Sequence, residues 1–464
     1  MTHRLTARTT VRLALGIALG FATAPGVLRA QITLAEAIRR ADGAAYGNRS
    51  AGAAAGLANA GRLAPMRGVL PTIRLEGGFL RTTDPIGAFG TRLKQREIAG
   101  ADFDPARLNY PNAVGNYSAG IVAEQPLLNL DSWMARRAAG RGAAASESAA
   151  QWTRLTTRVD VIRAYYGAVL AEERAAMLDA AAAAAESHVR QAESMVRAGM
   201  ATKSDALLAS VRAGEVETQR IEAHSDVGIA RRQLALLIGL GTNVEAEVPS
   251  RLPPADAIRR IAVEDSADRQ PAARLDVDAA RSQVGAARAD VQRARSLYLP
   301  RLNTFARYDW NSPQHLYGGD HSWTLGILAS WSLFDGGTQL TETQSAAARL
   351  EIASAAADAA ADQARLDTQR SLATLRAALA RLDIAERAVV QSAEAHRIVT
   401  RKYEGGLATV TELLDAATAE TGTTLALSSA RFGVISALAD RRRALGADPG
   451  TLVVLDTAAV AVNP

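Results

Sequence analysis

A segment near residue 200 recurs 207 positions later, and this repeat strongly limits how the chain can fold. Residues 197–209 are RAGMATKSDALLA, and residues 404–416 are EGGLATVTELLDA. Each copy lies between two long alanine-rich segments that contain no proline. A glycine that ends one helix, followed within a few residues by a Ser or Thr that caps the next, is typical of a tight turn between helices. The chain is therefore predicted to form the same long helical hairpin twice.

Other segments recur in the same order. The sequence AEAIRRA at 35–41 returns as ADAIRRI at 255–261, and Leu-Pro at 70–71 returns at 299–300. A period near 207 residues is far longer than the 20–50 residues of solenoid repeats. An internal duplication is therefore favoured over two unrelated turns. The predicted units are a first repeat at 31–245, a second repeat at 246–450 and a C-terminal tail at 451–464.

Long helices are predicted to dominate both repeats. The first hairpin is expected at 131–239 with its tip at 197–204, and the second at 338–446 with its tip at 404–411. About 67 residues of uninterrupted helix make a rod of roughly 100 Å. Apolar residues of the first rod have the 4-3-4-3 spacing of a coiled-coil seam: Leu155, Val159, Ile162, Tyr166 and Val169.

Each repeat also contains two segments of alternating polar and apolar character, which predicts strands. They are expected at about 69–80, 117–127, 300–310 and 323–334, and residues 81–116 are expected to form a loop. The last strand has one apolar face with tryptophans near both ends, as in strands that cross lipid. Membrane-interface positions are predicted for three aromatic residues: Trp323, Trp331 and Tyr117. The alternative, a strand of a soluble sandwich, needs more than four strands.

Four strands cannot close a barrel, and an open sheet edge in hydrocarbon leaves backbone groups unpaired. Copies of the chain must therefore share one barrel. Two copies give eight strands and a filled interior, whereas three give twelve strands and room for a channel. The predicted fold is mainly α with transmembrane β: a trimeric 12-stranded β-barrel continued by a long α-helical barrel.

The N-terminal segment 1–30 is typical of an export signal peptide. It has a basic start, an apolar segment of about 12 residues and a small residue, Ala30, before the expected cleavage point. The net charge of +5 includes four arginines from this segment and no acid, so the remaining chain carries +5 − 4 = +1. Nothing in this balance indicates a nucleic-acid partner.

The ordered set of features resembles the TolC family of outer-membrane efflux proteins. The resemblance rests on the duplicated helix–strand–strand–helix–helix plan, the Leu-Pro before each first strand and the paired G-(M/L)-A-T tips. It implies a homotrimer in the outer-membrane lipid, with a helical tunnel in the periplasm. The implied function is passive export in a tripartite efflux or type I secretion system, with a periplasmic adaptor protein and an inner-membrane transporter. The alternative is a periplasmic coiled-coil adaptor or structural protein without a membrane barrel.

The second tip carries the candidate residues for a gate. Glu412 and Asp415 are three positions apart, so they share a helix face, and threefold symmetry would stack two rings of carboxylates. The resemblance implies that these residues and Tyr403 line the closed tunnel entrance, and Asp205 of the first tip is included in this gate. Ala408 departs from the family, which has an arginine there. The alternative is that the acids are solvated residues at a helix start.

The tips themselves resemble the adaptor-docking surface of the family. The residues assigned to docking are Gly199, Met200, Ala201, Thr202, Gly406, Leu407, Ala408 and Thr409. A generic helical turn would look similar in sequence.

Catalytic, metal and cofactor sites are not expected. The six histidines are scattered, and His188 and His396 occupy nearly equivalent places on the two rods, where they are expected to face solvent. His315, Asp320 and His321 are expected to share an exposed loop. The chain contains no cysteine, so thiolate metal sites and disulfides are excluded.

Overall fold

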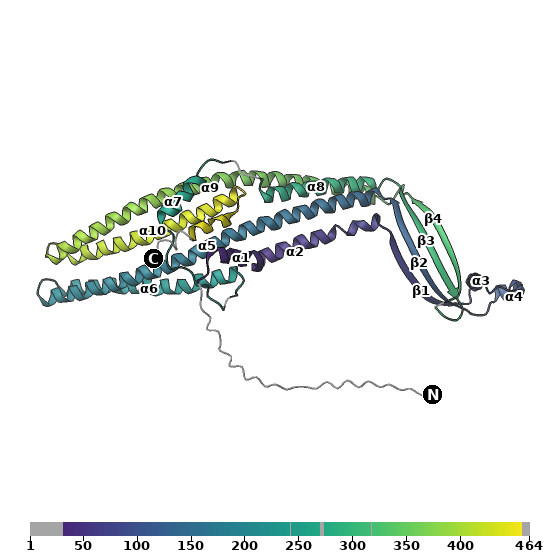
Figure 1. Cartoon of the computed structure of the whole chain (residues 1–464), viewed down its shortest axis with the longest axis horizontal. Coiled ribbons are helices and arrows are strands. Elements are labelled where there is room, and N and C mark those ends of the chain that lie inside the picture. The colour runs from purple at the N-terminus through teal and green to yellow at the C-terminus, as the bar shows by residue number, and fades with distance from the viewer. Residues whose placement is uncertain (1–30, 242, 270–272, 317, 457–464) are drawn as a thin grey trace, which may run out of the picture.

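The computed structural model describes residues 31–241, 243–269, 273–316 and 318–456. The predicted signal peptide at 1–30 lies outside these residues. The molecule is elongated, with a β-sheet at one end and the tips of two helical hairpins at the other (Figure 1). The described residues are thus mainly helical with four strands, in agreement with the sequence pattern.

The helical hairpins are the largest parts of the fold. Helix α5 has 68 residues and α9 has 67, and each is followed by a return helix of 35 residues. The helices of the two repeats are α1 Leu34–Ala44, α2 Tyr46–Gly61, α5 Leu130–Arg197, α6 Lys203–Leu237, α7 Ala255–Asp265, α8 Leu275–Ser296, α9 Thr338–Glu404 and α10 Val410–Ala444. Equal lengths in the two halves are what an internal duplication predicts.

Shorter helices complete each rod. Helix α2 packs on the part of α5 nearest the sheet, and α6 packs on the part nearest the tip (Figure 1). In the second half α8 and α10 flank α9 in the same way, and α8 also packs on α5. The main core lies in the middle of the molecule, where Val159, Ile162 and Tyr166 of the predicted seam are buried. Burial of this seam supplies the apolar contact that long helices need to be stable.

The four strands form one antiparallel sheet in the order β1-β2-β3-β4. Their bounds are β1 Thr72–Thr82, β2 Val114–Leu128, β3 Arg301–Ser312 and β4 Asp320–Ser330. Leu75 of β1 lies opposite Ile121 of β2, which lies opposite Tyr308 of β3. The register therefore places these apolar side chains on the same face of the sheet.

Two segments that were expected to be loops contain regular structure, so these predictions were wrong. The segment expected to be a loop contains helix α3 Pro85–Lys94, the 3-10 helix η2 Gly100–Phe103 and the short helix α4 Pro105–Asn109. Asp84 caps α3 by accepting a hydrogen bond from the Gly87 N–H, and Pro85 occupies the first turn, so the Asp-Pro pair starts a helix instead of a loop. Asp320 and His321 belong to β4 and not to a loop.

The last strand ends at Ser330, four residues before the predicted end. Trp331 therefore lies just beyond the strand, where its indole Nε1–H donates to the Tyr298 carbonyl at 3.0 Å. Gly336 and Gly337 then adopt positive φ angles of 71° and 92° and turn the chain into α9. Because of this hydrogen bond and turn, Trp331 does not pair with a neighbouring strand among the described residues.

The start of the predicted tail packs against the main core. The 3-10 helix η3 Pro449–Val453 follows α10, and Leu452 and Leu455 are completely buried. No helix among the described residues has the length and apolar character that a membrane span requires.

Candidate functional site

The turn at each tip depends on a glycine. Gly199 has φ 73° and Gly406 has φ 72°, a left-handed conformation that other residues rarely adopt. The Met200 N–H donates to the Met195 carbonyl at 2.9 Å, and the Leu407 N–H donates to the Lys402 carbonyl at 2.7 Å. These bonds satisfy the last carbonyls of α5 and α9, as in a Schellman motif.

The return helices start with matching capping boxes. Thr409 Oγ1 accepts from the Glu412 N–H at 3.2 Å, and the Glu412 carboxylate accepts from the Thr409 N–H at 2.7 Å. Thr202 and Asp205 repeat this pattern in the first tip, at 3.3 Å and 2.8 Å. Hydrogen bonds from the backbone and side chain of these threonines lower the pKa of Glu412 and of Asp205. Two of the three predicted gate acids, Glu412 and Asp205, therefore cap their own helices in the single chain.

Asp415 has different surroundings from Glu412. Its side chain is exposed, and it lies close enough to Arg212 of α6 to raise the pKa of that guanidinium, after the larger effect of Glu215. The two acids thus have separate neighbours within one chain. The stacked rings of carboxylates require several chains and stay a prediction.

Tyr403 lies at the junction of the two tips. It is only 4% exposed, and its hydroxyl has no hydrogen-bond partner among the described residues. Burial, and then the negative charge of Asp205, raise the pKa of Tyr403. The tips are held together here by what we call the tip cluster: Ala192, Ala209, Tyr403, Val410, Leu413 and Leu414. Ala408 is partly buried against this cluster.

The outermost tip residues are apolar and exposed. Met200 is 71% exposed and Leu407 is 82% exposed, and they occupy equivalent turns of the two hairpins. Each side chain projects beyond a turn that is fixed by a glycine and a capping box. The tips therefore present two similar contact points.

One face of the sheet carries a network of charges that sequence reasoning missed. Arg74 of β1 pairs with Glu124 of β2 at 2.6 Å, and Arg307 of β3 pairs with Asp309 at 2.7 Å and with Glu76 at 3.6 Å. Gly120 lies between Glu76 and Asp309 in the register, and a Cβ there would lie 2.5 Å from Asp309 Oδ1. The signal available in the sequence was a pair of charged residues two positions apart in each of two strands, Arg74 and Glu76 in β1 and Arg307 and Asp309 in β3.

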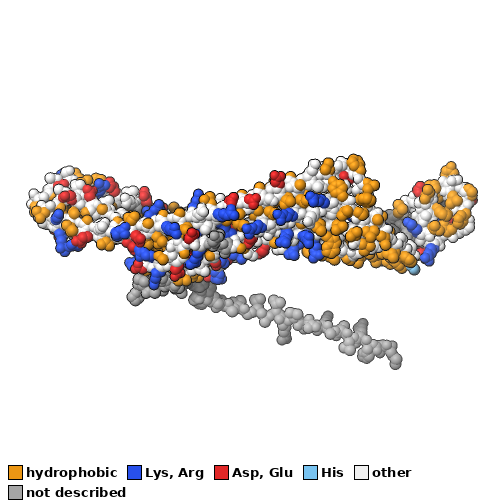
Figure 2. All heavy atoms as spheres, turned by 90° about the horizontal axis from the view of Figure 1, so that it is seen from above, with side chains coloured by type: hydrophobic (Ala, Val, Ile, Leu, Met, Phe, Trp, Pro, Cys, Tyr) orange, Lys and Arg blue, Asp and Glu red, His pale blue; other side chains and the backbone are white. Residues whose placement is uncertain are grey.

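The opposite face of the sheet is apolar and exposed. Trp323, Leu325 and Ile327 of β4 are each about two-thirds exposed or more, at 72%, 67% and 69%. Tyr117 packs on Phe79 on the same face, with ring centroids 4.7 Å apart. Figure 2 shows hydrophobic side chains gathered over the sheet end of the molecule, whereas charged side chains cover the helical body. Such an apolar surface needs cover by lipid or another chain.

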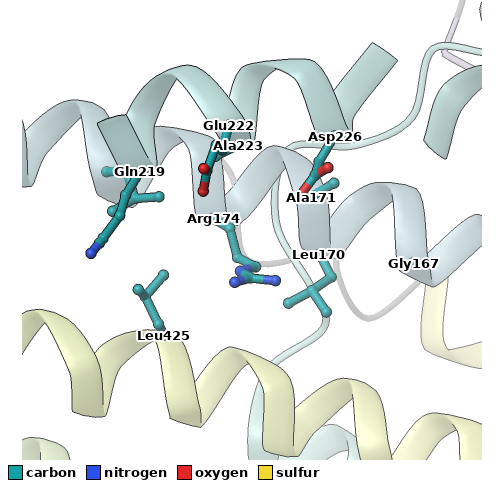
Figure 3. A pocket seen from close by; sticks show the side chains of 10 residues that line it. Gly167, Leu170, Ala171, Arg174, Gln219, Glu222, Ala223, Asp226 and Leu425 are labelled. Atoms are coloured by element: carbon teal, nitrogen blue, oxygen red, sulfur yellow. The ribbon is translucent and has the colours of Figure 1, made fainter. Parts of the chain in front are cut away.

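A small cavity of about 190 Å³ lies between α5, α6 and α10 (Figure 3). Arg174 of α5 points into it, near Glu222 and Asp226 of α6, and Leu425 of α10 closes the other side. The lining contains no nucleophile with an adjacent base. This cavity therefore gives no basis for a catalytic mechanism.

The prediction that two equivalent histidines face solvent was wrong. The rings of His188 and His396 meet edge to face between α5 and α9, with their centroids 6.0 Å apart. The two side chains reach each other from different hairpins, which a single-helix pattern cannot indicate. In the part of the chain that the structure describes, no group of three or more His, Asp or Glu side chains is arranged to hold a metal ion.

Comparisons with known proteins agree with this architecture. The family model described as "Outer membrane efflux protein" matches residues 68–240 and 269–447. A search of curated proteins finds no match.

Solved structures of outer-membrane proteins have the same fold. VceC of Vibrio cholerae matches with a TM-score of 0.74 and 20% identity, over 90% of this chain and 96% of that chain. The CmeC outer membrane channel of Campylobacter jejuni matches with a TM-score of 0.73 and 16% identity, over 96% and 94%. The open state of the MtrE outer membrane channel of Neisseria gonorrhoeae matches with a TM-score of 0.70 and 20% identity, over 90% of each chain.

Proposed function

The chain belongs to the outer membrane efflux protein family, and we propose that three copies of it form an exit duct through the outer membrane. The proposed duct passively conducts substrates that an inner-membrane transporter and a periplasmic adaptor deliver, in a tripartite efflux or type I secretion system. The observation that carries the proposal is the open four-stranded sheet with one exposed apolar face and one charged face.

The edges of the sheet favour a shared barrel. Strands β1 and β4 each have a neighbour on one side only among the described residues. In the hydrocarbon region each unpaired backbone group costs several kcal/mol, so the edges must pair with other copies. Three copies supply twelve strands and leave an aqueous interior. The charged face then lines water, and the apolar face contacts lipid.

With the apolar face toward lipid, three aromatic residues lie where the membrane interfaces are expected. Trp323 at one end of β4 and Trp331 just beyond the other end are suited to the two membrane interfaces, and Tyr117 lies on the same apolar face. We assign all three to contact with the interfacial region of the outer membrane.

The tips form the periplasmic entrance in this proposal. Glu412, Asp415, Asp205 and Tyr403 surround the narrowest part, and the carboxylates from three chains attract cations there. Because Ala408 replaces the family arginine, the closed entrance depends on contacts other than an arginine at this position. The tip cluster, which buries Tyr403 beside Asp205, is the contact that the single chain offers.

The exposed turn residues provide the docking surface for the adaptor. Met200 and Leu407 project with the neighbouring small residues Ala201 and Ala408 and the capping threonines Thr202 and Thr409. A helical hairpin of an adaptor can contact such small turns closely, tip to tip. The alternative of a soluble adaptor leaves the apolar face of the sheet without cover.

The absence of cysteine allows a sharp test. Thr324 and Leu325 are adjacent in β4 but face opposite sides of the sheet, with Thr324 opposite Arg307 of the charged face. In planar bilayers a charged, water-soluble thiol reagent is expected to change the single-channel current of Thr324→Cys. The matched Leu325→Cys variant is expected to be unaffected because lipid covers its thiol. A monomer by native mass measurement in detergent, or equal reactivity of both variants, would contradict the proposal.

A further inference from the structure

A pair of histidines joins the two hairpins close to the tips, within the last ten residues of each long helix. His188 belongs to α5 of the first hairpin, and His396 belongs to α9 of the second. Their ring centroids are 6.0 Å apart with an interplanar angle of 70°. Each ring is partly buried. The contact therefore links two parts of the chain that are more than 200 residues apart in sequence.

One ring nitrogen of this pair is hydrogen-bonded, and two others are buried without a partner among the described residues. Nδ1 of His396 is hydrogen-bonded to the carboxylate of Glu420 on α10. Nε2 of His396 and Nε2 of His188 are both buried and have no hydrogen-bond partner among the described residues. Buried polar atoms are normally satisfied, so two unpartnered nitrogens at one contact are available to a ligand.

The surroundings leave room for a ligand and its water. A cavity of about 480 Å³ is lined by both histidines and Glu420, and further by Arg212 and Glu215. Its remaining lining is mostly small, including alanines of α5 and threonines of α10. The cavity therefore borders both rings, whose Nε2 atoms are themselves buried.

We propose that His188 and His396 bind a divalent transition-metal ion such as Zn²⁺ through their Nε2 atoms. Neutral imidazole is a preferred ligand of such ions. A carboxylate on Nδ1 is the usual outer-shell partner of a metal-bound histidine, because it fixes the tautomer and leaves Nε2 free to bind. Glu420 occupies this position on His396 and is a positioning residue, not a ligand.

The ring separation agrees with a shared ion. At Zn–N distances of about 2.0–2.1 Å, two imidazoles on one ion have their ring centres roughly 5–6 Å apart. The observed separation of 6.0 Å lies at the upper end of this range. Water from the cavity fills the other coordination positions. A site with two protein ligands also agrees with the finding that no group of three or more suitable side chains exists among the described residues.

The bound ion would connect the two hairpins. It adds a coordinate link between α5 and α9 in each chain, near the proposed periplasmic entrance. The site does not depend on which substrate the duct conducts, and it can be tested in the absence of transport.

The test uses the full-length, metal-free protein in detergent, with any affinity tag removed. Titration calorimetry with Zn²⁺ at pH 7.5 is expected to show one ion per chain. His188→Gln and His396→Gln are each expected to weaken binding by at least 100-fold. His224→Gln is the matched control, because His224 is an exposed histidine of α6 that pairs with Asp179 and lies outside the cavity. Glu420→Gln is expected to weaken binding 10- to 100-fold without removing it.

A spectroscopic measurement keeps the proposal testable if a variant misfolds. The electron paramagnetic resonance spectrum of the unaltered protein with one equivalent of Cu²⁺ is expected to show two imidazole nitrogens. His188→Gln is expected to reduce this number to one, with the helical content by circular dichroism unchanged. The proposal is overturned if the unaltered protein shows no two-imidazole site, or if His224→Gln weakens Zn²⁺ binding as much as the other two histidine variants.

Discussion

The hydroxyl of Tyr165 on α5 donates a hydrogen bond to Asp456 at 3.0 Å, which joins the first long helix to the last described residue of the chain. Asp456 also accepts from the Leu34 N–H at 2.9 Å at the start of α1. Tyr165 is completely buried, and burial together with the charge of Asp456 raises the pKa of its hydroxyl well above the usual range. One carboxylate thus connects both ends of the described chain to the main core.

Replacing this carboxylate is expected to destabilise the core. Asp456→Ala removes the acceptor of the buried Tyr165 hydroxyl, which costs about 1–3 kcal/mol. Tyr165→Phe removes the donor instead and is expected to cost less, about 0.5–1.5 kcal/mol. The thermal midpoint measured by circular dichroism ranks the two variants. Equal midpoints for Asp456→Ala and the unaltered chain would show that water satisfies the hydroxyl.

Gly406 is expected to be sensitive to substitution because of its backbone angle and not because of crowding. A Cβ added at Gly406 meets nothing within 4 Å, but its φ of 72° costs other residues roughly 1–2 kcal/mol. Gly406→Ala is therefore expected to increase hydrogen exchange in the second tip. The neighbouring Gly405→Ala is the matched control, since Gly405 has φ −85°. If both variants exchange at the same rate, backbone strain does not determine the turn.

Adaptor docking is expected to follow the shape of both tips. Gly199 and Gly406 have the same conformation, so valine at either position distorts a contact point. Crosslinking yield between the tips and the adaptor, with Gly405→Ala as control, is expected to fall for Gly199→Val and for Gly406→Val. If crosslinking yield and export are unchanged for both valine variants, the tips are not part of the docking surface.

The gate prediction is sharpened by the capping role of Glu412. Alanine at this position removes a cap as well as a charge, whereas glutamine can keep the capping box and remove only the charge. Glu412→Gln with Asp415→Asn in one chain is expected to weaken the block of single-channel current by divalent cations added from the periplasmic side. Trimer assembly is expected to be unchanged, because neither Asp415 nor Glu412 belongs to the apolar tip cluster. If the block is not weakened, both acids act only as residues at the start of the helix and do not form a gate.

The tips are also expected to loosen in acid. The pKa values of Asp205 and Glu412 are lowered from their ordinary 3.8 and 4.5 in the folded chain. The stability that these caps contribute is therefore complete above the ordinary values and is lost as the pH falls through the lowered ones. Fraying of the first turns of α6 and α10, measured by hydrogen exchange corrected for intrinsic rate, is expected to increase below about pH 4. Glu412→Gln is expected to remove this pH dependence from α10 only.

The sequence by itself determined the elements whose chemistry is local. A glycine followed three residues later by a capping threonine specified each tip, at Gly199 and Thr202 and again at Gly406 and Thr409. Alternation at Trp323, Leu325 and Ile327 specified a strand and its apolar face. These features depend on backbone geometry and neighbouring residues, so they could be predicted without knowledge of the fold.

Only the tertiary structure decided which distant residues meet. Arg307 reaches Glu76 because the register of three strands puts Glu76 in line with Asp309, two positions from Arg307 on the same face. His188 meets His396 because the two hairpins approach each other at that level. The helix after Asp84 depended on a hydrogen bond to the Asp84 side chain, which the prediction of a loop did not consider. The position of Trp331 beyond β4 depended on a hydrogen bond from its indole, which the alternating pattern does not indicate. Local patterns specify elements, but contacts between elements depend on register and packing, which distant parts of the chain determine together.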